Sequence, residues 1–454
     1  MQVIVIGGGI SGLACAFRLK QLGISVVVLE ASGRPGGVIQ SVQEDGFLFE
    51  LGPQSFLATE KLVELIGQLG LQNEFLQADP KAPRYILWRG RLRPAPLAPP
   101  SLLYTPLLSA GTKWRLLTEP FRRSRPPDED ESIADFVRRK FGAELLDLLV
   151  APFVSGVYAG DPERLSLRAA FPSLHEWETK YGSVIRGAMK SRPEKGKPRP
   201  TLASFRRGVA TLPQTLAEKL GDCFWPNTAF DAIRRESANG KCGYLLEITG
   251  SGGKSQLKAP AIVVATPADV AKQILAPLSS VFSRALGKIE YAPVAVVGAA
   301  YLREQVQQPI NGFGFLVPRT EGLCILGTVW NSSLFPGRAP DGMAVLTSFI
   351  GGATDPQAVN LAESEIAATV EKENAQVLRI AGSPVTHAVH RYPRALPQYN
   401  LGHNQILAAL RKELTQLPGL FLTGNYLEGP AIGACVDHAF RIADSARAYL
   451  GSIQ

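Results

Sequence analysis

The sequence predicts an α/β protein of more than one domain, and three observations indicate this. An apolar strand at residues 3–6 runs into a glycine turn, an apolar-periodic helix at 13–22 and a second apolar strand at 26–30. A strand, a glycine turn and a helix recur near the C-terminal end, at 419–424 and 433–450. With 454 residues, of which 45% are hydrophobic, the chain can form two or three domains.

Apolar and alternating patterns predict the elements between these ends. Strands are expected at 224–233, 243–249 and 261–267, and strands of a second sheet at 294–302, 322–329 and 343–350. Helical patterns are expected at 133–149 and 363–378. The polar stretch 191–200 is rich in Pro, Lys and Arg and is predicted to be a mobile loop.

The composition is typical of a globular protein from a reducing compartment. The longest apolar stretches are shorter than the about 20 residues that a membrane span needs, and the apolar start at 3–6 does not resemble a signal peptide. The five cysteines are widely scattered, and the five histidines show no metal-ligand spacing. His387 and His390 are expected to be structural or surface residues. We therefore expect a cytoplasmic protein without a metal ion.

The net charge of +8 is concentrated in the segment 81–125, which carries ten basic residues and one acidic residue, Glu119. Leucines, Tyr104 and Trp114 lie between these cations. Such a mixture suits the anionic inner face of a membrane better than a nucleic-acid groove, and we expect no nucleic-acid partner. A solvated basic face is the alternative, and both interpretations stay open.

The first glycine turn has the G-x-G-x-x-G spacing of a Rossmann-type dinucleotide site. Its residues are Gly7, Gly8, Gly9, Ile10, Ser11 and Gly12. The glycines permit a tight turn, close approach of a pyrophosphate and close packing of helix on strand, while the helix N-terminus faces the phosphates. Glu30 follows Gly12 by 18 residues at the end of the second strand, where a carboxylate can hold a ribose.

A second glycine pair distinguishes FAD from NAD. Arg34, Gly36 and Gly37 lie just beyond Glu30 and offer further backbone and cationic contacts to a longer ligand. The turn Gly52, Pro53, Gln54 and Ser55 could lie against a flavin ring, with an ordinary β-turn as the alternative. The sequence therefore predicts an FAD site.

These motifs and several later segments resemble the flavin-containing amine oxidase superfamily, and within it the porphyrinogen oxidases of haem synthesis. The segments that carry the resemblance are 152–161, 165–168, 171–174, 312–318, 396–399 with Gly402 and His403, and 424–435. They occur in the order found in the family, and the resemblance spans essentially the whole chain.

The resemblance implies the cofactor contacts. The residues expected at FAD are Gly7 to Gly12, Glu30, Ala31, Val38, Gly52 to Ser55, Phe230 at the adenine end, and Gly424, Asn425, Pro430, Ala431 and Ile432 at the flavin. Asn425, Tyr426 and Pro430 differ from the residues that are commoner in the family, Ala, Ser and Val.

The resemblance also implies the substrate site. Arg84 is expected to pair with a tetrapyrrole propionate, for which a guanidinium is well suited, or else to be one more surface arginine. Phe313 and Leu316 would sandwich the macrocycle, with Gly156, Gly314 and Phe349 lining the cavity. The flavin would carry the chemistry, in three two-electron cycles with O₂ as acceptor and hydrogen peroxide as product, so no side chain is assigned as a catalytic acid or base.

The predicted fold is α/β, with a Rossmann-type FAD-binding domain, a mixed-sheet substrate domain and an inserted, mostly helical membrane-association domain. The FAD-binding domain is expected from 1–80, 201–270 and 416–454, the helical domain from 81–200 and the substrate domain from 271–415. An amine oxidase, a carotenoid-type desaturase and a non-catalytic flavin carrier are the alternative functions. Protoporphyrinogen IX and coproporphyrinogen III both remain candidate substrates. A homodimer and product transfer to a ferrochelatase are compatible with the sequence, which decides neither.

Overall fold

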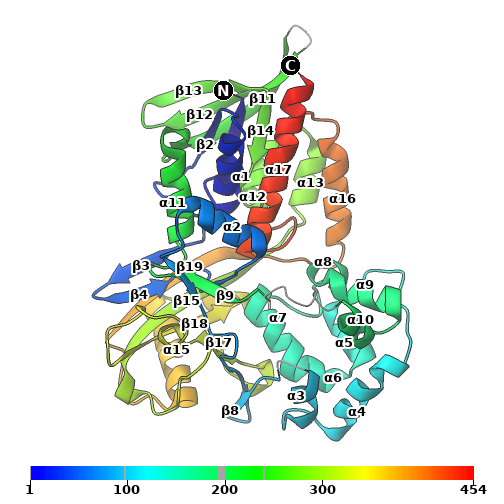
Figure 1. The fold of residues 1–454 in the computed structure, drawn as a ribbon, viewed down its shortest axis with the longest axis vertical. Coiled ribbons are helices and arrows are strands. Elements are labelled where there is room, and N and C mark those ends of the chain that lie inside the picture. Colours follow the sequence, from blue (N-terminus) through cyan, green and yellow to red (C-terminus); the bar gives the residue numbers. More distant parts are fainter. Residues whose placement is uncertain (1, 97–98, 192–199, 239–240, 454) are drawn as a thin grey trace.

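The computed structural model describes residues 2–96, 99–191, 200–238 and 241–453. Figure 1 shows an upper lobe that contains both chain ends, and two lower lobes. The loop expected at 191–200 lies, for residues 192–199, outside the described residues. Among the helices in these ranges, none is long and apolar enough to cross a membrane.

A five-stranded parallel sheet forms the centre of the upper lobe. Its order is β10 (Phe224–Trp225), β2 (Val26–Leu29), β1 (Val3–Ile6), β14 (Ala261–Val264) and β20 (Leu420–Leu422). In β1, Val3 and Val5 join the core on one face, whereas Ile4 and Ile6 join the core on the other. Because both faces are buried, the strands are apolar throughout.

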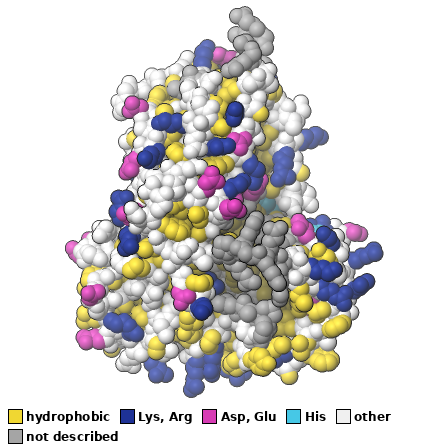
Figure 2. All heavy atoms as spheres, in the orientation of Figure 1, with side chains coloured by type: hydrophobic (Ala, Val, Ile, Leu, Met, Phe, Trp, Pro, Cys, Tyr) yellow, Lys and Arg dark blue, Asp and Glu magenta, His cyan; other side chains and the backbone are white. Residues whose placement is uncertain are grey.

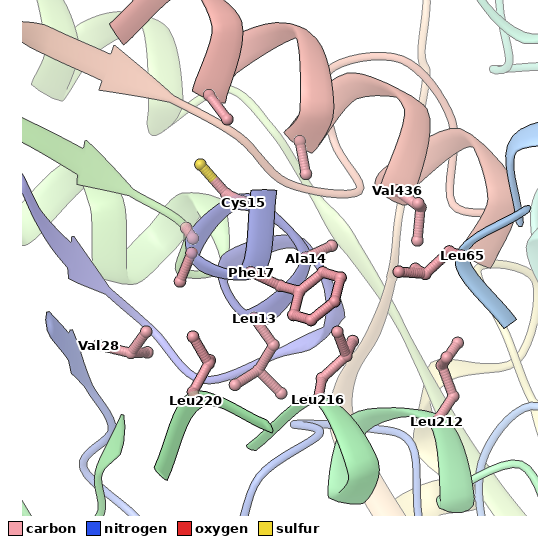
Figure 3. Close-up of a cluster of buried hydrophobic side chains, with 14 of the residues drawn as sticks. Leu13, Ala14, Cys15, Phe17, Val28, Leu65, Leu212, Leu216, Leu220 and Val436 are labelled. Carbon is pink, nitrogen blue, oxygen red and sulfur yellow. The ribbon is translucent and has the colours of Figure 1, made fainter. Parts of the chain in front are cut away.

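Two layers cover this sheet. One face carries α1 (Ile10–Gln21), α2 (Glu60–Leu69), α11 (Thr211–Leu220) and α17 (Ile432–Ser452). Figure 3 shows this core, in which Leu13 and Phe17 of α1 lie among residues of α2, α11 and α17. The other face carries the antiparallel sheet β11 (Ala229–Ala238), β12 (Lys241–Gly250) and β13 (Gly253–Ala259), with α12 (Ala268–Leu275), α13 (Ser280–Leu286) and α16 (His403–Leu414).

The lower left lobe in Figure 1 is built on a seven-stranded mixed sheet. Its order is β19 (Thr386–Pro397), β15 (Tyr291–Leu302), β18 (Met343–Gly351), β17 (Ile325–Val329), β16 (Gly314–Leu316), β7 (Arg84–Trp88) and β8 (Arg91–Pro94). The helix α15 (Glu363–Leu378) packs on one face of this sheet, and α14 (Asn331–Leu334) follows β17. The predicted second sheet and the helix at 363–378 are confirmed.

Smaller elements connect the lobes. They are the hairpin of β3 (Ser41–Glu44) and β4 (Phe47–Glu50), and the three-stranded sheet of β5 (Phe56–Leu57), β9 (Leu202–Phe205) and β6 (Phe75–Gln77). The buried Phe49 of β4 packs under the lower sheet, where a Cβ on Gly298 would lie 2.5 Å from its ring.

Two sequence expectations differ from the structure at the domain boundaries. Residues 84–94 were expected in the helical segment, but they form the edge hairpin β7–β8 of the lower sheet. The Pro and Arg content that suggested a boundary near residue 80 is compatible with an edge strand, which needs no complete hydrogen-bond ladder. In addition, α13 and α16 fall within 271–415, yet both pack on the upper sheet.

The lower right lobe in Figure 1 is helical. It consists of α3 (Pro99–Tyr104), α4 (Ala110–Thr118), α5 (Ile133–Lys140), α6 (Ala143–Leu145), α7 (Ala151–Tyr158), α8 (Leu167–Ala170), α9 (Pro172–Tyr181) and α10 (Val184–Lys190). The single helix expected at 133–149 is wrong, because the chain breaks at Gly142, whose φ of 99° lies outside the helical region.

A buried ionic cluster holds the helical lobe together. Lys140 Nζ lies 3.1 Å from Oε1 of Glu119 and 3.1 Å from Oε1 of Glu178, and all three side chains are buried. Arg139 Nη1 donates a second charged hydrogen bond to Glu178 at 2.8 Å. Burial raises the pKa of Glu178, but hydrogen bonds from Arg139, Ser124 and Lys140 outweigh burial and hold that pKa at about 2.

The loop 398–403 joins the helical lobe to the upper lobe. Gln398 Nε2 donates to the carbonyl of Tyr158 at 2.9 Å, and the Tyr399 hydroxyl donates to the carbonyl of Asn425. His403 Nε2 lies 3.0 Å from the carbonyl of Tyr426. Because a carbonyl only accepts, this geometry requires the proton on Nε2. Burial lowers the pKa of His403 to about 4.

We predict that Lys140→Met destabilises the protein by about 3–5 kcal/mol, because it leaves two buried carboxylates short of a cation. Urea unfolding followed by circular dichroism measures this change. The control is Arg138→Met, which removes an exposed ion pair with Glu163 and should cost less than about 1 kcal/mol. Equal losses for the two variants would contradict a central role for the cluster.

A second prediction concerns acid stability. Burial lowers the pKa of His403 from 6.5 to about 4, so the unfolded chain takes up a proton at a higher pH than the folded protein does. The contribution of His403 to the free energy of unfolding is therefore complete above pH 6.5 and is lost as the pH falls toward 4. This amounts to about 3 kcal/mol. His403→Asn should therefore lower stability at pH 7.5 and flatten its decline between pH 6.5 and 4, as measured by urea unfolding. An unchanged slope would show that protonation of His403 does not limit acid stability.

Candidate functional site

The first glycine turn lies at the carboxyl end of β1, at the start of α1. Gly7 has a φ of 110°, and a Cβ on Gly12 would lie 1.9 Å from the carbonyl oxygen of Gly7. These positions therefore require glycine. A Cβ on Gly9 would meet no atom within 4 Å, so the turn borders open space. No side chain caps α1, and its first backbone N–H groups face this space as anion donors.

Glu30 closes this turn from the end of β2. Its Oε2 accepts a hydrogen bond from Gly8 N at 2.7 Å, and its Oε1 accepts from Ser32 N at 2.8 Å. The backbone N–H of Thr228 binds the Glu30 carbonyl, which brings the start of β11, and with it Phe230, toward this strand end. Ala31 follows Glu30 and is exposed. The carboxylate, the open turn and the helix N-terminus together fit a ribose and a pyrophosphate.

The second glycine pair folds back onto the first turn. Gly36 N donates to the carbonyl of Gly8 at 2.8 Å. Arg34 Nη2 donates to the carbonyl of Gly37 at 2.8 Å, so this guanidinium shapes its own loop. Val38 lies at the end of the loop and is exposed. For a longer dinucleotide, the backbone of Gly36 and Gly37 is therefore better placed to make contacts than the Arg34 guanidinium.

The turn at 52–55 packs directly beside this loop. A Cβ on Gly52 would lie 2.1 Å from the carbonyl oxygen of Val38. Gln54 is buried: its Nε2 donates to the carbonyls of Glu50 and Gly52, and its Oε1 accepts from Asn331 at 2.6 Å. Gln54 thus ties the turn to the lower lobe, while Pro53 and Ser55 are partly exposed.

The turn between β20 and α17, at residues 424–431, is the C-terminal turn, and it lies at the same edge of the parallel sheet. Gly424 and Asn425 follow β20, whose carboxyl end lies beside that of β14, the neighbour of β1. Pro430 and Ala431 lead into Ile432, the first residue of α17, and no side chain caps this helix. The helices α1 and α17 pack against each other, so both N-termini face the place where parallel strands end.

The residues expected at the substrate meet on the lower sheet. The guanidinium carbon of Arg84 lies 5.3 Å from the centre of the Phe313 ring, and Arg84 is the register partner of Gly314 across β7 and β16. A Cβ on Gly156 of α7 would lie 2.6 Å from Leu316 Cδ2. The structure therefore brings Arg84 to Phe313 and Gly156 to Leu316.

These four residues, Arg84, Gly156, Phe313 and Leu316, form the candidate substrate wall. One row of residues paired across neighbouring strands links this wall to the glycine loops. Leu316 is paired with Gly327, Gly327 with Phe349, and Phe349 with Val296, which in turn pairs with His390 on β19. Residues paired across a sheet share one face. The row therefore runs from α7 to β19, and Phe349 lies in its middle.

Three residues near the glycine loops were not predicted from the sequence. The Tyr392 hydroxyl donates to the carbonyl of Val38 at 3.3 Å, and its ring lies 4.4 Å from that of His390. Burial and the nearby Arg34 lower the pKa of His390. Tyr399 holds the carbonyl of Asn425. His390 showed no motif, and its place on the shared face depends on a strand register that the sequence does not specify.

Among the described residues, no group of His, Cys, Asp and Glu side chains could hold a metal ion.

Comparisons with known proteins cover nearly the whole chain. A protoporphyrinogen oxidase, chloroplastic, of Oryza sativa subsp. japonica is 38% identical over 475 residues, with 98% of this chain and 88% of that protein covered. A coproporphyrinogen III oxidase of Bacillus subtilis (strain 168) is 32% identical over 474 residues, with 99% of each covered. The crystal structure of a candidate protoporphyrinogen oxidase from Exiguobacterium sp. 255-15 matches with a TM-score of 0.83 at 26% identity, covering 98% of both chains.

A family model described as flavin containing amine oxidoreductase matches residues 10–446. This match confirms the predicted flavin cofactor and the predicted oxidoreductase class, and it agrees with the mixed α/β architecture of several sheets. The chain belongs to the flavin-containing amine oxidoreductase family.

Proposed function

We propose that this chain is an FAD-dependent porphyrinogen oxidase, which converts protoporphyrinogen IX or coproporphyrinogen III to the corresponding porphyrin with O₂ as acceptor. Relatives with both names align along nearly the whole chain. The observation that carries the proposal is the contact of Arg84 with Phe313, because it places a cation beside an aromatic ring on an otherwise apolar wall. A reduced tetrapyrrole with propionate groups needs this combination.

The upper lobe supplies the cofactor site in this proposal. The N–H groups at the start of α1 would bind the pyrophosphate, Glu30 the ribose, and the start of α17 the flavin end. The loops at 36–38 and 52–55 would lie along the cofactor. The flavin accepts electron pairs and returns them to O₂, so the chain has to bind and orient the substrate and keep it beside the cofactor.

The lower sheet supplies the substrate wall. Arg84 would hold a propionate by charge-assisted hydrogen bonds, while Phe313 and Leu316 contact the faces of the macrocycle. A side chain at Gly156 would displace Leu316, because a Cβ there would lie 2.6 Å from Leu316 Cδ2. The row through Phe349 would extend this apolar surface toward the glycine loops.

The alternatives fit this wall less well. An amine substrate carries a positive charge, which the Arg84 guanidinium would repel. A carotenoid has no carboxylate for Arg84 to bind. A flavin carrier would bind FAD without turnover. Supplying the purified holoprotein with porphyrinogen, amine and carotene separately, and following O₂ uptake, distinguishes all four: uptake with porphyrinogen alone supports the proposal, and uptake with another class alone contradicts it.

We predict that Arg84→Ala lowers kcat/KM for porphyrinogen by roughly ten- to a hundredfold, chiefly through KM, because a charged hydrogen bond to the substrate is lost. Porphyrin fluorescence under steady-state conditions measures the rate. Arg91→Ala on the neighbouring strand β8 is the matched control and should leave kcat/KM unchanged. If the two variants behave alike, Arg84 does not bind the substrate. Running both porphyrinogens with each variant also identifies the preferred substrate.

We also propose that the helical lobe contacts the anionic inner face of a membrane. On and after α4, Trp114 is 67% and Phe121 79% exposed, and Tyr104 at the end of α3 is 85% exposed. Arg123 and Arg125 are exposed nearby. In Figure 2 hydrophobic side chains gather at the lower right edge, where α3 and α4 lie in Figure 1, and basic side chains lie to their left, near the position of β8. Exposed aromatic rings beside arginines match an interfacial membrane contact.

We predict that the double variant Trp114→Ser/Phe121→Ser loses binding to vesicles that contain anionic lipid, because it removes the apolar part of this surface. Vesicle flotation measures the bound fraction. Val385→Ser removes an exposed apolar side chain from the opposite lower lobe and should bind as the unchanged protein does. If the unchanged protein fails to float, the basic segment is only a solvated face.

A further inference from the structure

A groove lies between α13 and α16, outside the site described above. These helices lie side by side on the right of the upper lobe in Figure 1 and meet the helical lobe at the lower end of α16. The groove encloses about 910 Å³. This volume falls within the range of roughly 300–1,000 Å³ that small-molecule sites occupy. A ligand of tetrapyrrole or fatty-acid size could therefore fill it.

The two helical sides of the groove are mainly apolar. Val281 and Ala285 of α13 lie four residues apart on one helical face, and Ile406 and Ala409 of α16 line the opposite side. Leu401, at the lower end, is 47% exposed. A wall of this kind favours the apolar body of a ligand over a purely polar molecule.

Two cations border these walls without a carboxylate partner among the described residues. Arg284 and Lys288 are four residues apart, both line the groove, and both are exposed. Arg284 Nη1 donates only to the hydroxyl of Ser280, at 3.2 Å, within the part of the chain that the structure describes. The lining also contains Arg164 and two carboxylates, Glu163 and Glu290. Arg164 is paired with Glu290 at 2.7 Å, and Glu163 is paired with Arg138. The two remaining cations therefore offer charge for an anionic group.

The inner wall of the groove is the loop that also reaches the C-terminal turn. Gln398 and His403 both line the groove. His403 binds the carbonyl of Tyr426, and the neighbouring Tyr399 binds that of Asn425, the residue expected at the flavin. Gln398 is 4% exposed, and its Oε1 has no hydrogen-bond partner within the described ranges, so an acceptor is available at the inner end.

We propose that this groove binds an amphipathic carboxylate, a carboxyl group carried on a large apolar body. The walls would hold the body, and Arg284 with Lys288 would bind the carboxylate. Two sources share this chemistry: the porphyrin product, an assignment that rests on the proposed function, and a fatty acid, which does not. Tyr399 and His403 of the loop that lines the groove bind the carbonyls of Asn425 and Tyr426 in the C-terminal turn. A ligand in the groove would therefore change the surroundings of the flavin.

The test is a fluorescence titration of the holoprotein with coproporphyrin III and, separately, with the fluorescent fatty acid cis-parinarate. The variant Arg284→Glu/Lys288→Glu reverses both cations on the rim, and neither residue belongs to the proposed flavin or substrate contacts. We expect the variant to bind one of the two probes at the groove about tenfold or more weakly, with flavin content and basal turnover unchanged. Flavin fluorescence should respond to that probe in the unchanged protein and not in the variant.

The matched control is Lys412→Glu, which reverses an exposed charge on α16 outside the groove and should bind both probes normally. Ala409→Trp fills the groove without changing charge and should also abolish binding there. Loss of coproporphyrin III binding in the double variant identifies the product as the ligand, and loss of parinarate binding identifies a fatty acid. Equal binding of both probes by the unchanged protein and the double variant would overturn the proposal.

The two proposals fail separately in this experiment. If porphyrinogen is not oxidised but parinarate still binds in a manner that depends on Arg284 and Lys288, the proposed function is wrong and the groove remains a site. If porphyrinogen is oxidised but neither probe distinguishes the variants, the groove proposal alone is wrong.

Discussion

The direction of the five parallel strands in the upper lobe is the constraint on which the rest of the structure depends. Because β1 and β20 run the same way and are separated only by β14, the turns at Gly7 and Gly424 reach the same edge although more than four hundred residues separate them. Close packing of α1 against α17 then aims two uncapped helix N-termini at this edge. The topology alone therefore creates a place that is suited to an anion.

The lower sheet is hydrogen-bonded to the loops at the same edge of the upper sheet. The Tyr392 hydroxyl binds the carbonyl of Val38, and Asn331 binds Gln54, so the second glycine loop and the turn beside it are held from below by the sheet that carries Arg84 and Phe313. On the other flank, the loop 398–403 ties the helical lobe to the C-terminal turn. The proposed substrate wall and the proposed cofactor loops are therefore parts of one hydrogen-bonded unit, which explains why residues from distant segments can act on one reacting molecule.

Local patterns were sufficient to predict much of this arrangement. The spacing of Gly7 to Gly12, the position of Glu30 and the helix at 363–378 each depend on neighbouring residues, and the structure has a turn, a strand end and a helix at these places. The break at Gly142 depends on one backbone angle, which the apolar pattern that predicted a helix at 133–149 does not reveal. The strand pair at 84–94 depends on a distant partner, β16, so the local composition predicted the wrong segment for it. His390 and Tyr392 reach the glycine loops only through the register of β19 on β15, which no local signal determines.

The central claim is that a single substrate site and a single flavin oxidise the porphyrinogen completely to the aromatic porphyrin. The ratio of O₂ consumed to porphyrin formed tests this claim most directly. Oxidation of a porphyrinogen removes six electrons, whereas the flavin passes on two at a time. The account predicts three molecules of O₂ consumed for each porphyrin released by the purified holoprotein, with no partly oxidised intermediate leaving the site. Release of partly oxidised tetrapyrrole with one O₂ consumed per turnover would contradict it.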